Sequence, residues 1–450
     1  MKRRVWIMKA NVIVADLNHC GGGERLSLLT MHALSEMGID FDLTTLVSPN
    51  MPKLENRYGK NIVSVINKMK KLNIINIFEE LQLQLQQRKD DYHYYDYDIT
   101  INTLGDCAPY FHPTFSKYNA ITYCHYPSAK YHIEAENIDY LKELFIEIKS
   151  DNCIRAINND NQIDSSNYFK HGDDEHGLSY RIKEYFRILK YGYWNMMRNS
   201  TIVTNSEFSR KAILNAFGID FNSKIHIQSP PIDIETFSSY SVLMHEKEEK
   251  EKDDEYAHEW KDDIILTVSR IAPYKEIENA IKLARILKNR NIGKEMIIVG
   301  NLYNYFEYYS KLKQMVVDLG LTDYVKFEIN ASLDKLLAIM RKSKVYFHPR
   351  IGEHFGIAIV EAMAAGLIPV VSTIGGPAEF VPLRYQFNTL EHAAEIVSQA
   401  FHVPHVERVR ISNSVNKFSN SQYIEGFQRL VNQFLLLPSF RRECRQTTGL

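Results

Sequence analysis

"KVYFHPRIGEHFGIAIVEAMAAGLIPVVST", residues 344–373, consists of apolar segments separated by one short polar loop. Its first part, "KVYFHP", predicts a buried strand, and its last part, "LIPVVST", predicts another. Between them, the run from Gly356 to Ala365 is composed almost entirely of Gly, Ile, Val, Ala and Met, and we expect a helix there. Strand, loop, helix and strand in this order predict a parallel sheet that is covered by helices.

The same alternation extends through both halves of the chain. In the C-terminal half, strands are expected in "DIILTVSRI", "EMIIVG" and "YVKFEI", and helices in "EIENAIKLARILKNR", in a segment that ends at "VVDLG", and in "LDKLLAIMRKS". In the N-terminal half, strands are expected in "VWIMKANVIVADL", "IDFDLTTLVSP", "DYDITINTL", "YNAITYCHYP" and "STIVT", and helices after the glycine loop "HCGGGERL" and in "SEFSRKAILNAFG". Two such series predict an α/β chain with two facing Rossmann-like domains and a ligand-binding cleft at the carboxyl ends of their strands.

The length of 450 residues also favours two domains. We expect an N-terminal domain at residues 1–222 and a C-terminal domain at 223–425, with "IHIQSPPIDIETF" near the crossing between them. Residues 426–450 are expected to be a C-terminal helix and tail that can return to the N-terminal domain.

Three stretches have no readable function: residues 50–95, 151–190 and 244–263. The second is rich in Asn and Asp and is expected to be a surface excursion, and the third is expected to be a solvated, charged loop. Within the first, "INKMKKLNIINIFEELQLQL", residues 66–85, predicts a helix. Its three lysines and its apolar residues fit either a core-packed helix with a basic edge or an interfacial helix on a membrane.

Composition and cysteine usage narrow the class of protein. A net charge of −1 gives no global attraction to nucleic acid, and the 45% apolar content is enough for sizeable cores. The five cysteines are scattered without CxxC spacing, which argues against a disulfide framework or a zinc site. No apolar run approaches the ~20 residues that a membrane span needs. We therefore expect a cytoplasmic protein, with peripheral association at the cytoplasmic face of a membrane as the form that any membrane binding would take.

The polar loop and the helix after it contain a candidate ligand site. The free N–H groups around Gly356 can hold phosphate oxygens, and the missing side chain permits close approach. Glu361, about 7–8 Å further along the helix, suits the two hydroxyls of a ribose. Glu353, before the helix, can reach hydroxyls on a group attached to the phosphates. A single glutamate is more often an ordinary surface charge, so the prediction depends on the combination.

Other loops add candidate residues. Arg270 and Lys275 follow a predicted strand and can neutralise a diphosphate. The glycines at 21–23 begin a helix and can form a second phosphate cradle. A Rossmann dehydrogenase is the rival interpretation, but Leu26 stands where its third glycine is needed and no acid ends the second strand. His125 ends another strand, where a lone histidine is more often structural.

Several of these motifs together resemble one family. "EHFGIAIVEAMAAG…PVVSTIGGPAEFV" resembles the E-x7-E block of the retaining GT-B glycosyltransferases, the glycosyl transferases group 1 family. "VSRIAPYKEIENAI" is similar to the family's Arg…Lys pair, although Tyr274 stands where a glutamate usually precedes the lysine. "HCGGGERL" matches its GG-x-E-R loop. "YPSAKYHIE", "EHFGI" and "GGPAEFV" are most similar to the GDP-mannose-dependent members that extend lipid-linked oligosaccharides. The resemblance covers roughly residues 5–50, 95–140 and 195–435.

The resemblance implies a retaining hexosyltransferase. Its expected donor is GDP-mannose, its expected acceptor is a glycan on a polyprenyl diphosphate, and no metal is expected. It places the acceptor on the N-terminal domain and the nucleotide sugar on the C-terminal one. It implies catalytic roles for His125, Arg270, Lys275 and Glu353. The implied donor-binding residues are Gly22, Gly23, Arg270, Lys275, Glu353, Phe355, Gly356, Ile357 and Glu361.

Some alternatives stay open from the sequence. "DYD", Asp96 to Asp98, imitates a DxD metal motif, but it opens a strand and we interpret it as structural. The residues do not decide between GDP and UDP, between mannose and other hexoses, or between acceptors and oligomeric states. A UDP-sugar-dependent glycosyltransferase acting on another glycan or lipid is the main alternative, and a non-catalytic nucleotide-binding module is a weaker one.

Overall fold

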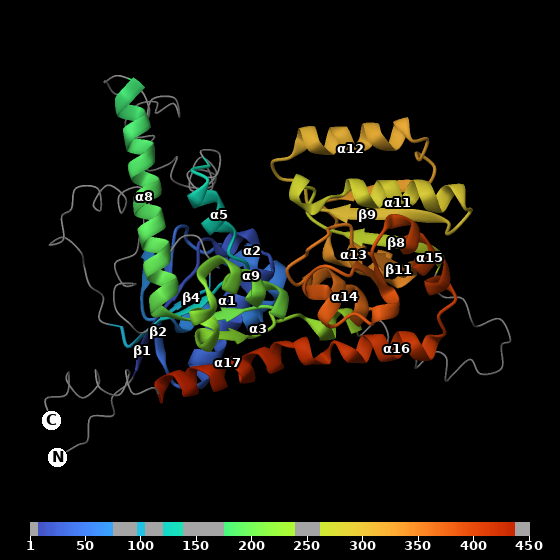
Figure 1. The fold of residues 1–450 in the computed structure, drawn as a ribbon. Helices are drawn as coiled ribbons and strands as arrows, with labels where there is room; N and C mark the ends of the chain where they lie inside the picture. The colour runs from blue at the N-terminus through green and yellow to red at the C-terminus, as the bar shows by residue number, and fades with distance from the viewer. Residues whose placement is uncertain (1–7, 75–96, 104–119, 138–174, 239–261, 437–450) are drawn as a thin grey trace, which may run out of the picture. The chain divides into compact units, whose positions relative to one another are not determined.

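The computed structural model describes residues 8–74, 97–103, 120–137, 175–238 and 262–436 (Figure 1). The chain divides into two compact units, each with its own parallel sheet. Unit 1 comprises the chain up to Asn205, Ser209–Gln228 and the chain from Tyr423, and unit 2 comprises Ser206–Phe208 and Ser229–Gln422. The α/β class with two Rossmann-like sheets is as predicted, and the domain bounds at 222/223 and 425/426 stay a prediction.

Unit 1 contains a sheet of seven strands in the order β3-β2-β1-β4-β5-β6-β7. Every neighbouring pair is parallel, with Ala10 opposite Phe41 on one side and Ile99 on the other. Its strands are β1 (Lys9–Ile13), β2 (Asp40–Thr45), β3 (Leu72–Ile74), β4 (Ile99–Asn102), β5 (Ala120–Tyr123), β6 (Ser200–Thr204) and β7 (Ile225–Ile227).

Helices pack on this sheet in two apolar clusters. Helices α1 and α17 contribute to one cluster, in which the hydroxyl of Tyr423 lies 2.7 Å from that of Thr30. Helices α8 and α9 contribute to the other, through residues such as Tyr193 and Phe217. The helices are α1 (Gly22–Glu36), α2 (Met51–Tyr58), α3 (Lys60–Val63), α5 (Ser128–Glu134), α8 (Glu175–Asn199), α9 (Glu207–Phe217) and α17 (Asn420–Leu435).

Two predictions for this unit were wrong within the described residues. Residues 66–74 do not form the predicted helix: they form the end of a 3-10 helix (Ser64–Lys68) and the edge strand β3. The backbone of Leu72 pairs with that of Leu43, so pairing with the sheet overrides the local pattern. Residues 175–190, predicted as part of a surface excursion, belong to α8. The rest of both stretches, and most of 244–263, lie outside the described residues.

Unit 2 contains a six-stranded parallel sheet in the order β10-β9-β8-β11-β12-β13. Its strands are β8 (Asp262–Val268), β9 (Glu295–Gly300), β10 (Val325–Ile329), β11 (Ser343–Phe347), β12 (Ile368–Ser372) and β13 (Gln386–Phe387). Its helices are α11 (Glu278–Asn289), α12 (Phe306–Asp318), α13 (Leu333–Lys342), α14 (Ile357–Ala364), α15 (Leu390–Phe401) and α16 (His405–Ser414). The predicted strands and helices of residues 262–373 are all confirmed.

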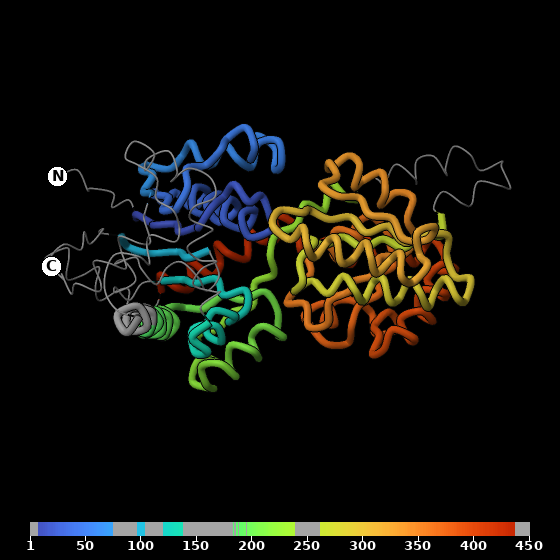
Figure 2. Tube along the Cα trace, turned by 90° about the horizontal axis from the view of Figure 1, so that it is seen from above, coloured from blue at the N-terminus to red at the C-terminus, as the bar shows by residue number. Residues whose placement is uncertain are grey.

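The strand order distributes these helices over both faces of the sheet. The connections β8-α11-β9 and β9-α12-β10 run in one direction along the sheet, and β11-α14-β12 runs in the other. Right-handed crossovers then place α11 and α12 on one face and α14 on the other. Helix α12 lies beside α11 in both views (Figures 1 and 2). The carboxyl ends of the adjacent strands β8 and β11 therefore open onto the same edge, where the candidate site lies.

Among the described helices, none is long and apolar enough to cross a membrane. Cys20 and Cys124, the two cysteines of the described ranges, are free thiols.

Candidate active site

The loop between β11 and α14 forms the centre of the site in unit 2. It begins at His348, whose N–H still donates to the carbonyl of Val370 as in the sheet ladder. It ends at Gly356, which has φ = 85° and is the N-cap of α14. A Cβ at Gly356 would lie 2.4 Å from Ile359 Cδ1, so both the backbone angle and the space require glycine.

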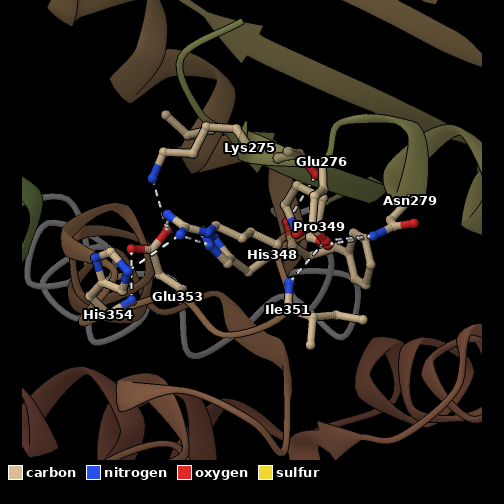
Figure 3. Close-up of polar contacts among 12 residues, drawn as sticks. Lys275, Glu276, Asn279, His348, Pro349, Ile351, Glu353 and His354 are labelled. Carbon is tan, nitrogen blue, oxygen red and sulfur yellow. Dashed lines mark hydrogen bonds and ion pairs between the residues drawn. The ribbon is translucent and has the colours of Figure 1, made fainter. Parts of the chain in front are cut away.

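Glu353 is the most strongly bonded side chain in this loop (Figure 3). Its Oε2 accepts hydrogen bonds from Lys275 Nζ at 2.8 Å and from His348 Nε2 at 3.2 Å. Its Oε1 accepts from the backbone N–H of His354 at 3.0 Å, and Arg350 Nη1 lies 3.9 Å from Oε2. The Glu353 side chain is only 9% exposed. The sequence predicted Lys275 and Glu353 separately, and the structure brings them into direct contact.

These contacts fix the charge state of the cluster. Burial raises the pKa of Glu353, but the hydrogen bond from His348 and the charges of Lys275 and Arg350 outweigh it and hold the pKa well below its usual range. Burial lowers the pKa of His348, against the opposing effect of Glu353. We therefore assign an ionised Glu353 that accepts the Nε2–H of a neutral His348. The other ring nitrogen, Nδ1, lies 3.3 Å from the hydroxyl of Tyr346.

Two glycines hold the backbone of Glu353 in place. The N–H of Gly376 donates to the Glu353 carbonyl at 2.8 Å, and Glu353 forms a parallel bridge with Gly375. Gly375 has φ = 131°, and a Cβ on Gly376 would lie 2.0 Å from the carbonyl oxygen of His354. The two segments can approach this closely only because both positions lack side chains.

Phe355, predicted to bind the donor, points into the protein. It is 5% exposed, and its ring lies 5.4 Å from that of Phe380 and 5.3 Å from that of Phe418. Its side chain therefore anchors the loop in the core. Donor binding through its backbone stays a prediction.

Arg270 and Lys275 lie in the loop after β8, as predicted. The Lys275 side chain is 17% exposed and is bonded to Glu353. Arg270 is exposed, and its guanidinium carbon lies 5.6 Å from the ring centre of Tyr274, which lies edge-on to Tyr305. Among the described residues, no carboxylate forms an ion pair with Arg270. Arg270 is thus a cation available to an anionic ligand, held by an aromatic ring.

Helix α14 begins directly after Glu353 and contains the second predicted glutamate. Its first N–H groups, at Ile357 and Ala358, have no partner within the helix. Glu361 lies half-buried one turn further on. Burial raises the pKa of Tyr346 well above its usual value, and the carboxylates of Glu353 and Glu361 raise it further. Both predicted glutamates therefore lie close enough to the Tyr346 hydroxyl to affect it electrostatically.

The predicted residues of unit 1 form a separate group. A Cβ on Gly23 would lie 3.9 Å from His125 Nε2, so the start of α1 and the end of β5 are neighbours. Burial lowers the pKa of His125 to about 4, against a hydrogen bond with the backbone of Thr103, so the imidazole is neutral. The N–H of Gly21 is already bonded to the Glu24 carboxylate at 2.7 Å. Gly22 and Gly23 therefore offer the remaining N–H groups of this helix start.

Sequence reasoning missed His348 and Arg350, although both stand in the quoted "KVYFHPR" beside Glu353. Their position at a strand end was the only available signal. Asp98 accepts a hydrogen bond from the backbone N–H of Lys9 at 2.7 Å, which agrees with a structural role, and Asp96 lies outside the described residues. In the described part of the chain, no three His, Cys, Asp or Glu side chains are grouped to hold a metal ion. Independence from metals stays a prediction.

Comparisons with known proteins agree with this geometry. Residues 248–390 match the family model described as "Glycosyl transferases group 1". The chain is 25% identical over 362 residues to the GDP-Man:Man(3)GlcNAc(2)-PP-Dol alpha-1,2-mannosyltransferase of Dictyostelium discoideum, covering 75% of this chain and 64% of that protein. The human protein of the same name is 24% identical over 50% of this chain and 46% of its own length. The chain thus spans less than two thirds of either relative.

Solved structures show the same fold. A glycosyltransferase from Rickettsia africae superposes with a TM-score of 0.59 at 14% identity, covering 96% of this chain and 99% of that one. Anabaena Alr3699/HepE in complex with UDP gives a TM-score of 0.55 at 14% identity, with 95% and 99% covered. The chain therefore has the GT-B fold and carries, in residues 248–390, a domain of the glycosyl transferases group 1 family.

Proposed function

We propose that this protein is a retaining glycosyltransferase that transfers a mannosyl group from GDP-mannose to a glycan on a polyprenyl diphosphate. The main support is the contact between Lys275 and Glu353 at the carboxyl end of the unit 2 sheet. It places a cation suited to a diphosphate and a carboxylate suited to sugar hydroxyls one hydrogen bond apart. The names of the relatives, which specify GDP-Man and PP-Dol, support the donor and the acceptor class.

The leaving group is the nucleoside diphosphate. Negative charge develops on its terminal phosphate as the bond to the sugar breaks, and fixed donors aimed at that charge lower the barrier. Arg270 supplies an exposed guanidinium, and the N–H groups of Gly356, Ile357 and Ala358 supply backbone donors. Lys275 has three N–H groups and uses one of them on Glu353, so the others are available to phosphate oxygens.

Glu353 positions the sugar in this proposal. A carboxylate with a strongly lowered pKa is a weak base and a weak nucleophile, which does not suit a covalent intermediate. Its Oε2 already accepts two hydrogen bonds, whereas Oε1 accepts one, from a backbone N–H. Oε1 thus retains accepting capacity for a sugar hydroxyl. The acceptor hydroxyl then attacks on the face that the diphosphate leaves and gives its proton to the departing phosphate oxygen, which gives retention.

The remaining predicted residues hold other parts of the donor. The carboxylate of Glu361 accepts hydrogen bonds from the two ribose hydroxyls. His125, as a neutral imidazole, is suited to a hydrogen bond with a sugar hydroxyl and does not supply charge. At Gly22 and Gly23 the start of α1 has no side chains that would keep a ligand from its N–H groups.

Transfer from radiolabelled sugar nucleotides tests the proposal. The purified protein is given GDP-mannose, GDP-glucose, UDP-glucose or UDP-N-acetylglucosamine, each with a polyprenyl-diphosphate-linked glycan or with the same glycan free in solution. We expect turnover with GDP-mannose and the lipid-linked acceptor, an α-linked product by NMR, and full activity in EDTA. Transfer from a UDP sugar would replace the donor assignment. Binding of GDP-mannose without any transfer would favour a nucleotide-binding module. Loss of activity in EDTA, restored by manganese, would contradict metal independence.

Association with membranes is a separate part of the proposal. The three lysines of unit 1 near β3 are all exposed: Lys68, Lys70 and Lys71. Basic residues near an anionic surface contribute about 1 kcal/mol each to binding. Flotation with anionic vesicles at low salt is expected for the wild type, and it should fall when the three are replaced by glutamate. The matched control replaces three exposed lysines of unit 2, Lys311, Lys313 and Lys335, by glutamate. Equal flotation of both variants would contradict the proposal that Lys68, Lys70 and Lys71 form the membrane-binding surface.

A further inference from the structure

The residue after Lys275 has an unusual backbone. Glu276 follows the 3-10 helix Pro273–Lys275 and has φ = 53°, ψ = 42°, in the left-handed region. This conformation is strained for a residue with a Cβ, whereas glycine adopts it freely. Strained residues of this kind persist where the surrounding contacts hold them, often beside functional sites. The contacts of Glu276 therefore indicate what the strain serves.

The Glu276 side chain binds the loop that leads to Glu353 (Figure 3). Its Oε2 accepts hydrogen bonds from the backbone N–H of Ile351 at 3.2 Å and from Asn279 Nδ2 at 3.1 Å. Asn279 Nδ2 also lies 3.1 Å from the carbonyl oxygen of Pro349, to which it donates. Glu276 and Asn279 thus bind the backbone of residues 349–351 through one N–H group, that of Ile351, and one carbonyl, that of Pro349. We call these contacts the 276–279 bridge.

The 276–279 bridge joins the same two loops as the pair of predicted catalytic residues. Glu276 is next to Lys275 in the chain, and Ile351 is two residues before Glu353. The contacts of the 276–279 bridge therefore lie next to both partners of the ion pair between Lys275 and Glu353, whose charged atoms are 2.8 Å apart. Lys275 alone, on four flexible methylene groups, would not fix the loop.

We propose that Glu276 and Asn279 are positioning residues for sugar transfer: they hold residues 349–351 so that Glu353 meets the sugar while Lys275 meets the diphosphate. The proposal extends the function proposed above and depends on it. Neither residue contacts the reacting atoms. Their effect is on the geometry of Glu353, and a displacement of about 1 Å in a positioned group can cost on the order of a hundredfold in rate.

Glycine at position 276 gives a sharp test because it removes the bridge and also relieves the backbone strain. Glu276→Gly should keep or raise the melting temperature. Its kcat should fall about ten- to hundredfold, with the dissociation constant for GDP within about twofold of the wild type, because the diphosphate contacts remain. Glu276→Gln should recover most of the kcat, since its amide oxygen accepts from the same N–H group. Asn279→Ala should lower kcat, and combining it with Glu276→Gly should add little further loss.

A matched control is available in the same unit. Asn291 is exposed and also has a left-handed backbone, with φ = 55°, just after α11. Asn291→Gly makes the same backbone change away from the bridge and should leave kcat unchanged.

Hydrogen exchange separates the bridge from the proposed function. The amide of Ile351, followed by mass spectrometry without any substrate, should exchange about tenfold faster in Glu276→Gly than in the wild type or in Glu276→Gln. Unchanged exchange, or faster exchange with wild-type kcat, would overturn the positioning role. A wild-type protein that transfers no sugar from any donor would instead overturn the proposed function, and the exchange result would still decide whether the bridge holds the loop.

Discussion

Replacing Lys275 by methionine should destabilise unit 2 because a buried carboxylate then loses its nearer cationic partner, at 2.8 Å, and keeps only Arg350 at 3.9 Å. Removing one partner of a buried pair costs roughly 3–5 kcal/mol. Glu353 retains hydrogen bonds from His348 and the His354 amide, so we expect the lower end, about 3 kcal/mol. For a unit of this size that corresponds to a fall of about 6–12 °C in melting temperature.

The loss should also depend on pH. In the wild type, the lowered pKa of Glu353 means that its stabilising contacts are present above the unfolded-state value of about 4.3 and are lost only as pH falls through the folded-state value. Without Lys275, only His348, Arg350 and the His354 amide oppose the effect of burial, so the pKa of Glu353 is lowered less than in the wild type. The stability deficit of Lys275→Met should therefore be present in full above about pH 4.3 and shrink as pH falls below that value, because the wild type then loses the larger contribution.

Calorimetric unfolding at pH 7 and at pH 3 measures the effect. The matched control is Lys335→Met, which breaks the pair with Glu328 at 2.6 Å, where the two side chains are 54% and 34% exposed. An exposed pair of this kind contributes at most about 1 kcal/mol. Adding Glu353→Gln to Lys275→Met should restore part of the lost stability, because the incompletely compensated buried charge is gone. A deficit equal to that of the control, or no recovery in the double variant, would refute the reasoning.

Three further predictions concern the donor site and unit 1. Glu361→Ala should weaken donor binding about tenfold with little change in kcat, whereas Glu353→Gln should chiefly lower kcat; calorimetric binding and steady-state kinetics separate the two, and wild-type behaviour of both would contradict the site assignment. Arg270→Ala should lower kcat/KM about ten- to hundredfold while the melting temperature stays unchanged, because the side chain is exposed; unaltered kcat/KM would exclude a role in leaving-group stabilisation. The pKa of His125 is about 4 in the folded protein, so the unfolded chain takes up a proton at this residue first as pH falls from about 6.5, and the stability of the wild type should drop between pH 6.5 and 4. Urea unfolding should show a smaller drop in His125→Asn. Equal drops in the two proteins would show that His125 does not cause this pH dependence.

Much of unit 2 could be predicted because its elements are locally consistent. The predicted strands are short apolar runs, helices such as α11 and α13 have a 3.6-residue apolar period, and both patterns agree with the burial in the structure. The order of the strands then explains why Lys275 and Glu353 meet: they follow β8 and β11, which are adjacent in the sheet. The sequence predicted that both residues belong to the donor site, but not that they bond to each other, because that depends on the rotamers of two loops.

The elements that could not be predicted owe their structure to distant partners. β3 has three residues and exists through its pairing with β2, whereas its local pattern favours a helix. Helix α8 packs in the core of unit 1 through residues such as Phe186, Leu189 and Tyr193. The 276–279 bridge has no signature either, because a left-handed conformation is typical of glycine or asparagine and a glutamate gives no reason to expect it.

The close packing at Gly375 and Gly376 predicts which variants a deep mutational scan of this protein would lose. Any side chain at 376 meets a carbonyl oxygen 2.0 Å away, so variants there should disappear from a library that is sorted on soluble abundance alone. Glu276 should tolerate glycine and glutamine in the same sort, and glycine there should be depleted only when the library is sorted on transfer activity. Comparing the two sorts would separate residues that the loop around Glu353 needs in order to fold from residues that position Glu353 for transfer.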